Sequence, residues 1–198
     1  MRLFNIFKKK PTEEKKIIAE KIEEKEIEEK NYDLPYFGKI NINNLEEYYN
    51  VNIDFNKSSI NTDLNFKNKV IEGGGIEHIE TFLKNIENFD KSNKVHIEKD
   101  FNKQNGQTLD YINFYLDELS ENEIAGIIDV ENQDIPKNVL LLKKLRLIRV
   151  GLYPDGKYGA NYYATFDYSV DVDGEPCNQL LVVNTDGNGD LDHITWES

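Results

Sequence analysis

Apolar residues change their spacing twice along this chain. From about residue 35 they alternate with polar residues, which is typical of half-buried strands, in segments 40–42, 51–55 and 60–66. From residue 76 to residue 145 they recur every three or four positions, as on one face of a helix. From residue 148 alternation returns. The order predicted is strands, then helices, then strands.

The early strands and the helices have recognisable ends. The polar segment 56–59 is short enough to close a hairpin between the second and third strands. Gly73-Gly74-Gly75 is interpreted as a flexible connector, because a phosphate-binding loop would need a Lys and a Ser or Thr. Ser120 with Glu123 forms a capping-box pattern. The predicted helices cover residues 76–89, 91–103, 109–119, 120–128 and the segment from Pro136 to Leu145.

The last fifty residues predict an antiparallel meander. Its expected strands are 148–152, 162–170, 180–183 and 191–196, and Asp-Gly pairs at 155–156, 173–174 and 186–187 mark turns. The fold class predicted is α+β, with one antiparallel sheet formed by the N-terminal hairpin strands and the C-terminal meander. The helical middle packs on one face of that sheet.

Residues 32–198 are predicted to form a single domain, preceded by a charged tail, residues 1–31. Residues 12–30 consist almost entirely of Glu, Lys, Ile and Ala, which indicates a solvated helix or spacer. Residues 1–10 place Leu3, Phe4, Ile6 and Phe7 before three lysines. That segment suits either a loosely docked end or shallow contact with an anionic membrane surface.

The net charge and the cysteine content indicate which class of binding partner and which cellular compartment to expect. The formal net charge is −13, which opposes binding to nucleic acid and favours a basic protein as partner. The single cysteine, Cys177, excludes an intrachain disulfide and favours the cytoplasm.

One stretch resembles a metal site. Residues 186–197 place Asp186, Asn188, Asp190 and Asp192 at the first, third, fifth and seventh positions of a calcium-type loop, and a Glu at the twelfth. The sixth position, which needs Gly, is Leu191, and both flanks have strand periodicity. A tight hairpin between Val183 and Ile194 explains the same residues and is the favoured interpretation.

Several short segments together resemble an uncharacterised bacterial family, a domain of unknown function found in small acidic cytoplasmic proteins. They are residues 3–10, 34–38, 150–156, 166–168, 182–186 and 194–198. The resemblance covers about residues 32–198 and implies neither an activity nor catalytic residues.

The sequence contains no nucleophile, base or cofactor signature, so a non-enzymatic function without a cofactor is favoured. We expect an acidic module that binds a basic protein, as an immunity protein or antitoxin does. Four residues are expected on its exposed polar faces: Asp167 and Asp171 on one strand, and Asp54 and Asp63 on the early hairpin. The alternative is a calcium-stabilised domain, or a metal-assisted hydrolase, that uses the Asp186–Asp192 turn with His193. A third hypothesis is a scaffold with no dedicated ligand.

Overall fold

The computed structural model describes residues 29–132 and 134–198. The predictions for residues 1–10, and for most of the charged tail, lie outside these residues. Strands are β1 (Asn31–Leu34), β2 (Gly38–Asn41), β3 (Tyr48–Phe55), β4 (Ser58–Asn65), β5 (Arg146–Leu152), β6 (Ala164–Ser169), β7 (Asp171–Val172), β8 (Glu175–Pro176), β9 (Leu180–Thr185) and β10 (Leu191–Glu197). Helices are α1 (Gly73–Lys84), α2 (Ile86–Phe101), α3 (Gln107–Glu118), α4 (Glu121–Ile127) and α5 (Lys137–Leu142), with a 3-10 turn, η1, at Lys157–Gly159.

The main sheet has six strands in the order β10-β9-β6-β5-β4-β3. All neighbours are antiparallel except β4 and β5, which run parallel. The prediction of a wholly antiparallel sheet is therefore wrong at this pair. The reason is the helical middle: all five α-helices lie between β4 and β5, and a long crossover can bring the chain back in its original direction, which a tight turn cannot. The α+β class itself is confirmed.

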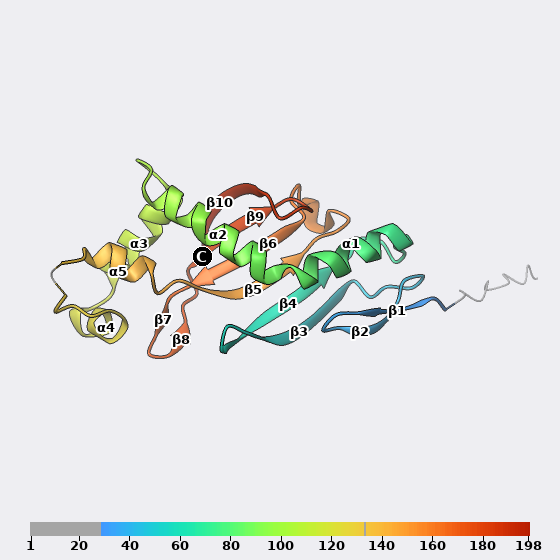
Figure 1. Ribbon diagram of the computed structural model, residues 1–198, viewed down its shortest axis with the longest axis horizontal. Helices are drawn as coiled ribbons and strands as arrows, with labels where there is room; N and C mark the ends of the chain where they lie inside the picture. The colour runs from blue at the N-terminus through green and yellow to red at the C-terminus, as the bar shows by residue number, and fades with distance from the viewer. Residues whose placement is uncertain (1–28, 133) are drawn as a thin grey trace, which may run out of the picture.

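Helices α1 and α2 lie over one face of the sheet, while α3, α4 and α5 gather at one end and the β1–β2 hairpin lies at the other (Figure 1). The spacing that predicts the first helix supplies its buried face, Ile76, Ile79, Phe82 and Leu83. The Phe82 ring lies 4.5 Å from that of Phe89 and 6.2 Å from that of Phe166 on β6. Aromatic packing thus joins both helices to the centre of the sheet.

Two helix boundaries differ from the sequence prediction. The glycine triplet forms the first turn of α1 and is not a connector before it. Asn85, with φ −107° and ψ 6°, then separates α1 from α2, so the predicted helix 76–89 ends early and its last residues begin a second helix. The predicted capping box of α4 is present, with Ser120 accepting from the Glu123 backbone N–H.

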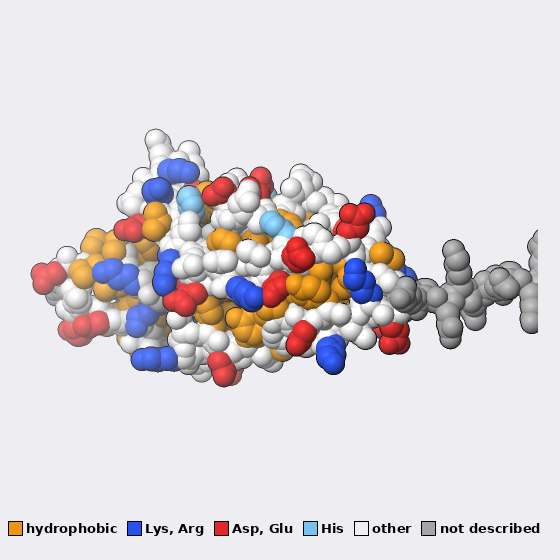
Figure 2. Space-filling view, turned by 45° about the vertical axis from the view of Figure 1, so that its right-hand side comes forward, with side chains coloured by type: hydrophobic (Ala, Val, Ile, Leu, Met, Phe, Trp, Pro, Cys, Tyr) orange, Lys and Arg blue, Asp and Glu red, His pale blue; other side chains and the backbone are white. Residues whose placement is uncertain are grey.

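The surface of the described residues mixes charge types. On the face shown in Figure 2, exposed apolar side chains form patches between acidic and basic side chains. Within the described part of the chain, none of the helices is both long and apolar enough to cross a bilayer.

Candidate functional site

The face of the sheet turned away from α1 and α2 carries polar side chains in cross-strand rows. Phe166 and Tyr168 of β6 contact the helices. Because successive side chains of a strand alternate, their neighbours Thr165 and Asp167 point to the opposite face of the sheet. One row across this face is Asp63, Gly151, Thr165, Asn184 and His193. The next is Asn61, Arg149, Asp167, Val182 and Thr195.

Arg149 on β5 is the centre of this face. Its Nε and Nη2 donate to the two carboxylate oxygens of Asp63 on β4, at 2.6 and 3.0 Å. Its Nη1 donates to Asp167 on β6 at 2.9 Å, and its Nη2 also contacts the Tyr153 hydroxyl at 3.1 Å. One guanidinium therefore links three neighbouring strands. We call Asp63, Arg149 and Asp167 the Arg149 network.

The aspartates of this network are interior groups. The side chain of Asp63 is 0% exposed and that of Asp167 is 6% exposed, whereas Arg149 is 31% exposed. The prediction that Asp63 and Asp167 lie on exposed polar faces is wrong. Period two assigned them to the correct face of their strands, but it did not show that an arginine from a third strand covers them.

Burial and charge act against each other in the network. Burial raises the pKa of Asp167, the charge of Asp63 raises it further, and Arg149 lowers it in part. Burial alone would lower the pKa of Arg149, but the hydrogen bond to Asp63 and the charges of both aspartates raise it overall. A buried carboxyl with a raised pKa occurs at many acid–base sites. Here it is paired with Arg149, which suits a group that joins strands.

An aromatic band borders the network. The Tyr153 ring lies 6.4 Å from that of Tyr158 and 5.6 Å from that of Tyr162, which is 6.2 Å from His193. His193 also contacts Asn184 through Nε2, at 3.1 Å, and Asp192 through Nδ1, at 2.6 Å. In the sequence analysis, His193 is a candidate only for the alternative metal site, although its register partner Asn184 lies on the same face as the network.

The predicted hairpin between Val183 and Ile194 is confirmed, since these two residues are register partners in β9 and β10. Asp186 shapes its turn: one carboxylate oxygen accepts the backbone N–H groups of Asn188 and Asp190, at 2.8 and 3.0 Å. Asp192 contacts His193 instead. Across residues 29–132 and 134–198, no three His, Cys, Asp or Glu side chains are grouped so that they could hold a metal ion.

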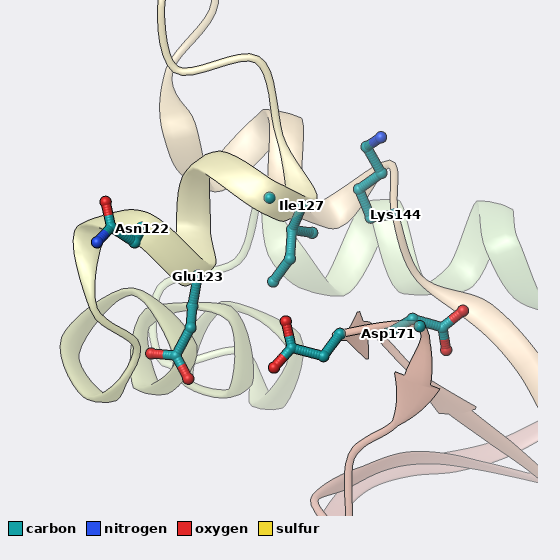
Figure 3. A pocket seen from close by; sticks show the side chains of 8 residues that line it. Asn122, Glu123, Ile127, Lys144 and Asp171 are labelled. Carbon is teal, nitrogen blue, oxygen red and sulfur yellow. The ribbon is translucent and has the colours of Figure 1, made fainter.

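A cleft of about 350 Å³ separates α4 from the β7–β8 hairpin. It is lined by Asn122, Glu123, Gly126, Ile127, Lys144, Asp171, Asp173 and Gly174. Figure 3 shows Glu123 extending from α4 toward the hairpin and Lys144 pointing away from Glu123. The predicted Asp173-Gly174 turn closes the hairpin with both residues at positive φ, 54° and 86°. Such a turn suits the twist of two short antiparallel strands.

Arg146, the other arginine of β5, fixes one wall of this cleft. Its Nε donates to both carboxylate oxygens of Asp171, at 2.9 and 2.8 Å. The sequence pattern predicted that Asp167 and Asp171 lie on one exposed polar face. Asp171 is instead half-buried and paired with Arg146, so the two aspartates do not form such a face. The four predicted partner-binding residues are dispersed: two lie in the Arg149 network, Asp171 borders the cleft, and Asp54 is exposed on the outer strand β3.

Compared with models of protein families, with curated proteins and with solved structures, the chain matches none. The resemblance to a bacterial family of unknown function stays a prediction.

The opposite pKa shifts of Asp167 and Glu123 give opposite pH dependences. Asp167 binds its proton more tightly in the folded state, so its contribution to the free energy of unfolding grows as the pH falls through its folded pKa. Hydrogen bonds from Ser120 lower the pKa of Glu123, so its contribution is present above the unfolded pKa and is lost as the pH falls through the folded pKa.

We therefore expect urea titrations from about pH 6 to about pH 3.5 to separate the two groups. The free energy of unfolding of the wild type minus that of Asp167→Asn should rise on acidification. The free energy of unfolding of the wild type minus that of Glu123→Gln should fall over the same pH range. Two differences that change in the same direction would contradict the burial assigned to Asp167.

If Asp186 stabilises a hairpin turn and does not bind an ion, its substitution should lower stability, and calcium should not change stability. Asp186→Ala removes the acceptor for two backbone N–H groups and should lower the free energy of unfolding by about 1–2 kcal/mol. Asp186→Asn, which keeps an oxygen acceptor, should cost less. Millimolar calcium should leave the Tm of the wild type unchanged, because an ion bound to the native state raises stability. A calcium-dependent rise in Tm that Asp186→Ala abolishes would favour the ion site.

Proposed function

We propose that this chain is a non-enzymatic binding module that holds a basic segment of a protein partner at one end of the molecule. We define the acidic end as the segment 117–134 with the β7–β8 hairpin. Its carboxylates are Asp117, Glu118, Glu121, Glu123, Asp129, Glu131, Asp134, Asp171, Asp173 and Glu175. The segment 117–134 contains no Lys or Arg. Acidic side chains lie at the left edge of Figure 2, where this end projects, with basic side chains beside them.

The cleft between α4 and the β7–β8 hairpin carries the proposal. Glu123 contributes a carboxylate from the α4 wall and Asp173 contributes one from the hairpin wall, with Ile127 as an apolar surface between them. Lysine and arginine side chains have an apolar stem and a charged tip. A cleft with an apolar wall and carboxylates on two sides therefore suits such a side chain.

The carboxylates of the acidic end differ in whether they already form an ion pair within the chain. Asp171 is paired with Arg146. Glu123 accepts hydrogen bonds from the backbone N–H and the hydroxyl of Ser120. It forms no ion pair with any lysine or arginine of the part of the chain that the structure describes. Among the described residues, no lysine or arginine forms an ion pair with Asp173 or Glu175. These three carboxylates remain for a partner's positive charge.

The charge of the whole chain supports the same partner class. A net charge of −13 steers a basic protein toward the molecule and raises the association rate at low ionic strength. The kind of partner that fits is a basic protein that is neutralised by binding, as immunity proteins and antitoxins neutralise theirs. The Arg149 network is not assigned to this contact, because both of its aspartates are buried and paired.

A binding titration with a defined basic probe tests the proposal. We expect a lysine- and leucine-containing peptide of about ten residues to bind the full chain at low salt and to weaken steeply as salt rises. The double variant Asp173→Lys with Glu175→Lys should weaken it about tenfold or more, since a like charge at a contact repels the probe. The matched control, Asp33→Lys with Glu46→Lys, changes the net charge equally on exposed residues away from the cleft and should cost no more than about twofold.

Calorimetry measures all three proteins. Equal weakening by the two double variants would show that net charge alone attracts the probe and would contradict the cleft. No binding of the wild type at low salt would contradict the proposal as a whole.

A further inference from the structure

β3 forms one edge of the six-stranded sheet (Figure 1), and its outer side makes no backbone hydrogen bond to any described residue. Its pairing with β4 runs from Tyr48 to Phe55 without a bulge. Such an edge is a template for another strand, and proteins usually protect it with a lysine, a proline, a bulge or a very short strand. β3 has eight residues and contains no lysine, arginine, proline or glycine.

The opposite edge of the sheet has the protection that β3 lacks. β10 has a bulge near its start and carries two carboxylates, Asp192 and Glu197. Bulges and charges both discourage the addition of a strand. Of the two outer strands of the main sheet, β3 is therefore the one that is open to another strand.

Every second residue of β3 directs its backbone groups to the free edge. The Glu47 carbonyl, just before β3, accepts the Phe66 N–H at 3.0 Å, so odd-numbered residues bond toward β4 and even-numbered residues face outward. The outward-facing residues are Tyr48, Asn50, Asn52 and Asp54. Near the end of the strand, Tyr36 borders a cavity of about 210 Å³ with Asp54 and Asn56, so open space remains beside the edge there.

We propose that β3 pairs antiparallel with β3 of a second copy of this chain, about a two-fold axis that passes through Asn52 perpendicular to the sheet. Such an axis keeps each face of the sheet on its own side, and opposed residues are equally far from Asn52. A two-fold axis is the commonest symmetry of protein oligomers, and it requires a surface that is complementary to itself. β3 meets that requirement on both of its faces.

On the face that packs on the core, the two-fold axis brings apolar side chains opposite one another. Tyr49 faces Phe55 of the copy, and Val51 faces Ile53, and the symmetry forms each pair twice. Ile53 is buried, and the other three side chains are half-buried and pack against the core. Aromatic pairs and pairs of β-branched residues across neighbouring strands stabilise antiparallel sheets. The second copy therefore continues the apolar row of β3.

The polar face of the pair contains no opposed like charges. Asp54, the only charged residue of β3, faces Asn50 of the copy, and Asn52 faces its own equivalent. An amide opposite a carboxylate can donate to it, whereas like charges directly opposite are unfavourable. A pairing centred on Val51 would lose both aromatic pairs. This self-complementarity selects a second copy as the occupant of the edge. The inference is independent of the acidic end.

Analytical ultracentrifugation of the full chain, from micromolar to millimolar concentration, tests the pairing. We expect a reversible monomer–dimer equilibrium, weak because the interface is small. It should strengthen as salt rises, because both copies carry a charge of −13. Asn52→Lys, an exposed substitution, should weaken the dimer about tenfold or more, since two lysines meet at the axis. The matched control, Asn102→Lys at the exposed end of α2, changes the net charge equally and should change the dissociation constant by no more than about twofold.

Hydrogen exchange of the wild type locates the contact without a substitution. The backbone amides of Asn50, Asn52 and Asp54 should become protected as the concentration rises, whereas those of Val51 and Ile53, which face β4, should be protected at every concentration. A chain that stays monomeric, a dimer that leaves the three outward amides unprotected, or equal weakening by the two lysine variants would overturn the proposal. Protection of the outward amides that does not depend on concentration would place a segment of the same chain on the edge, and would also overturn it.

Discussion

The sheet depends on charge compensation at its centre. β5 joins the early hairpin to the C-terminal strands, and it pairs in parallel with β4 and antiparallel with β6. Arg149 crosses both junctions by pairing with Asp63 and Asp167. A buried carboxylate without a partner is strongly unfavourable, so the two aspartates are tolerated because the arginine is there. Gly151 also contributes: a side chain at that position would clash with the Arg149 guanidinium, which lies over it.

The same strand connects the sheet to the proposed binding region. Arg149 holds β4 and β6, and Arg146, at the start of β5, holds Asp171 at the start of the β7–β8 hairpin. The two arginines of the described residues therefore stabilise two different parts of the structure. One organises the polar face, and the other positions one wall of the acidic cleft. The opposite wall, α4, begins at a capping box, so a specific side-chain interaction fixes each side of the cleft.

Local patterns predicted the elements well. Period two placed β3, in which less exposed and exposed residues alternate. The expected strands 180–183 and 191–196 correspond to β9 and β10, although β9 is buried on both faces. The Ser120 capping box marked the start of α4, and the C-terminal hairpin turns followed from Asp and Gly, which tolerate positive φ. These are short-range properties of the chain.

Long-range pairing was not predictable in the same way. The direction of β5 relative to β4 depends on how five helices return the chain, and no single segment encodes that path. The burial of Asp63 and Asp167 depends on an arginine 86 and 18 residues away, respectively. The sequence shows an acidic surface but not which carboxylates are already neutralised.

The most direct test of the account compares Arg149→Gln with the triple variant that adds Asp63→Asn and Asp167→Asn, by urea unfolding near neutral pH. The account predicts that the single variant loses about 3–5 kcal/mol, because two buried carboxylates lose their cation. The triple variant should recover a large part of that loss, since it buries neutral amides instead. A triple variant no more stable than Arg149→Gln would contradict charge compensation as the constraint on the sheet.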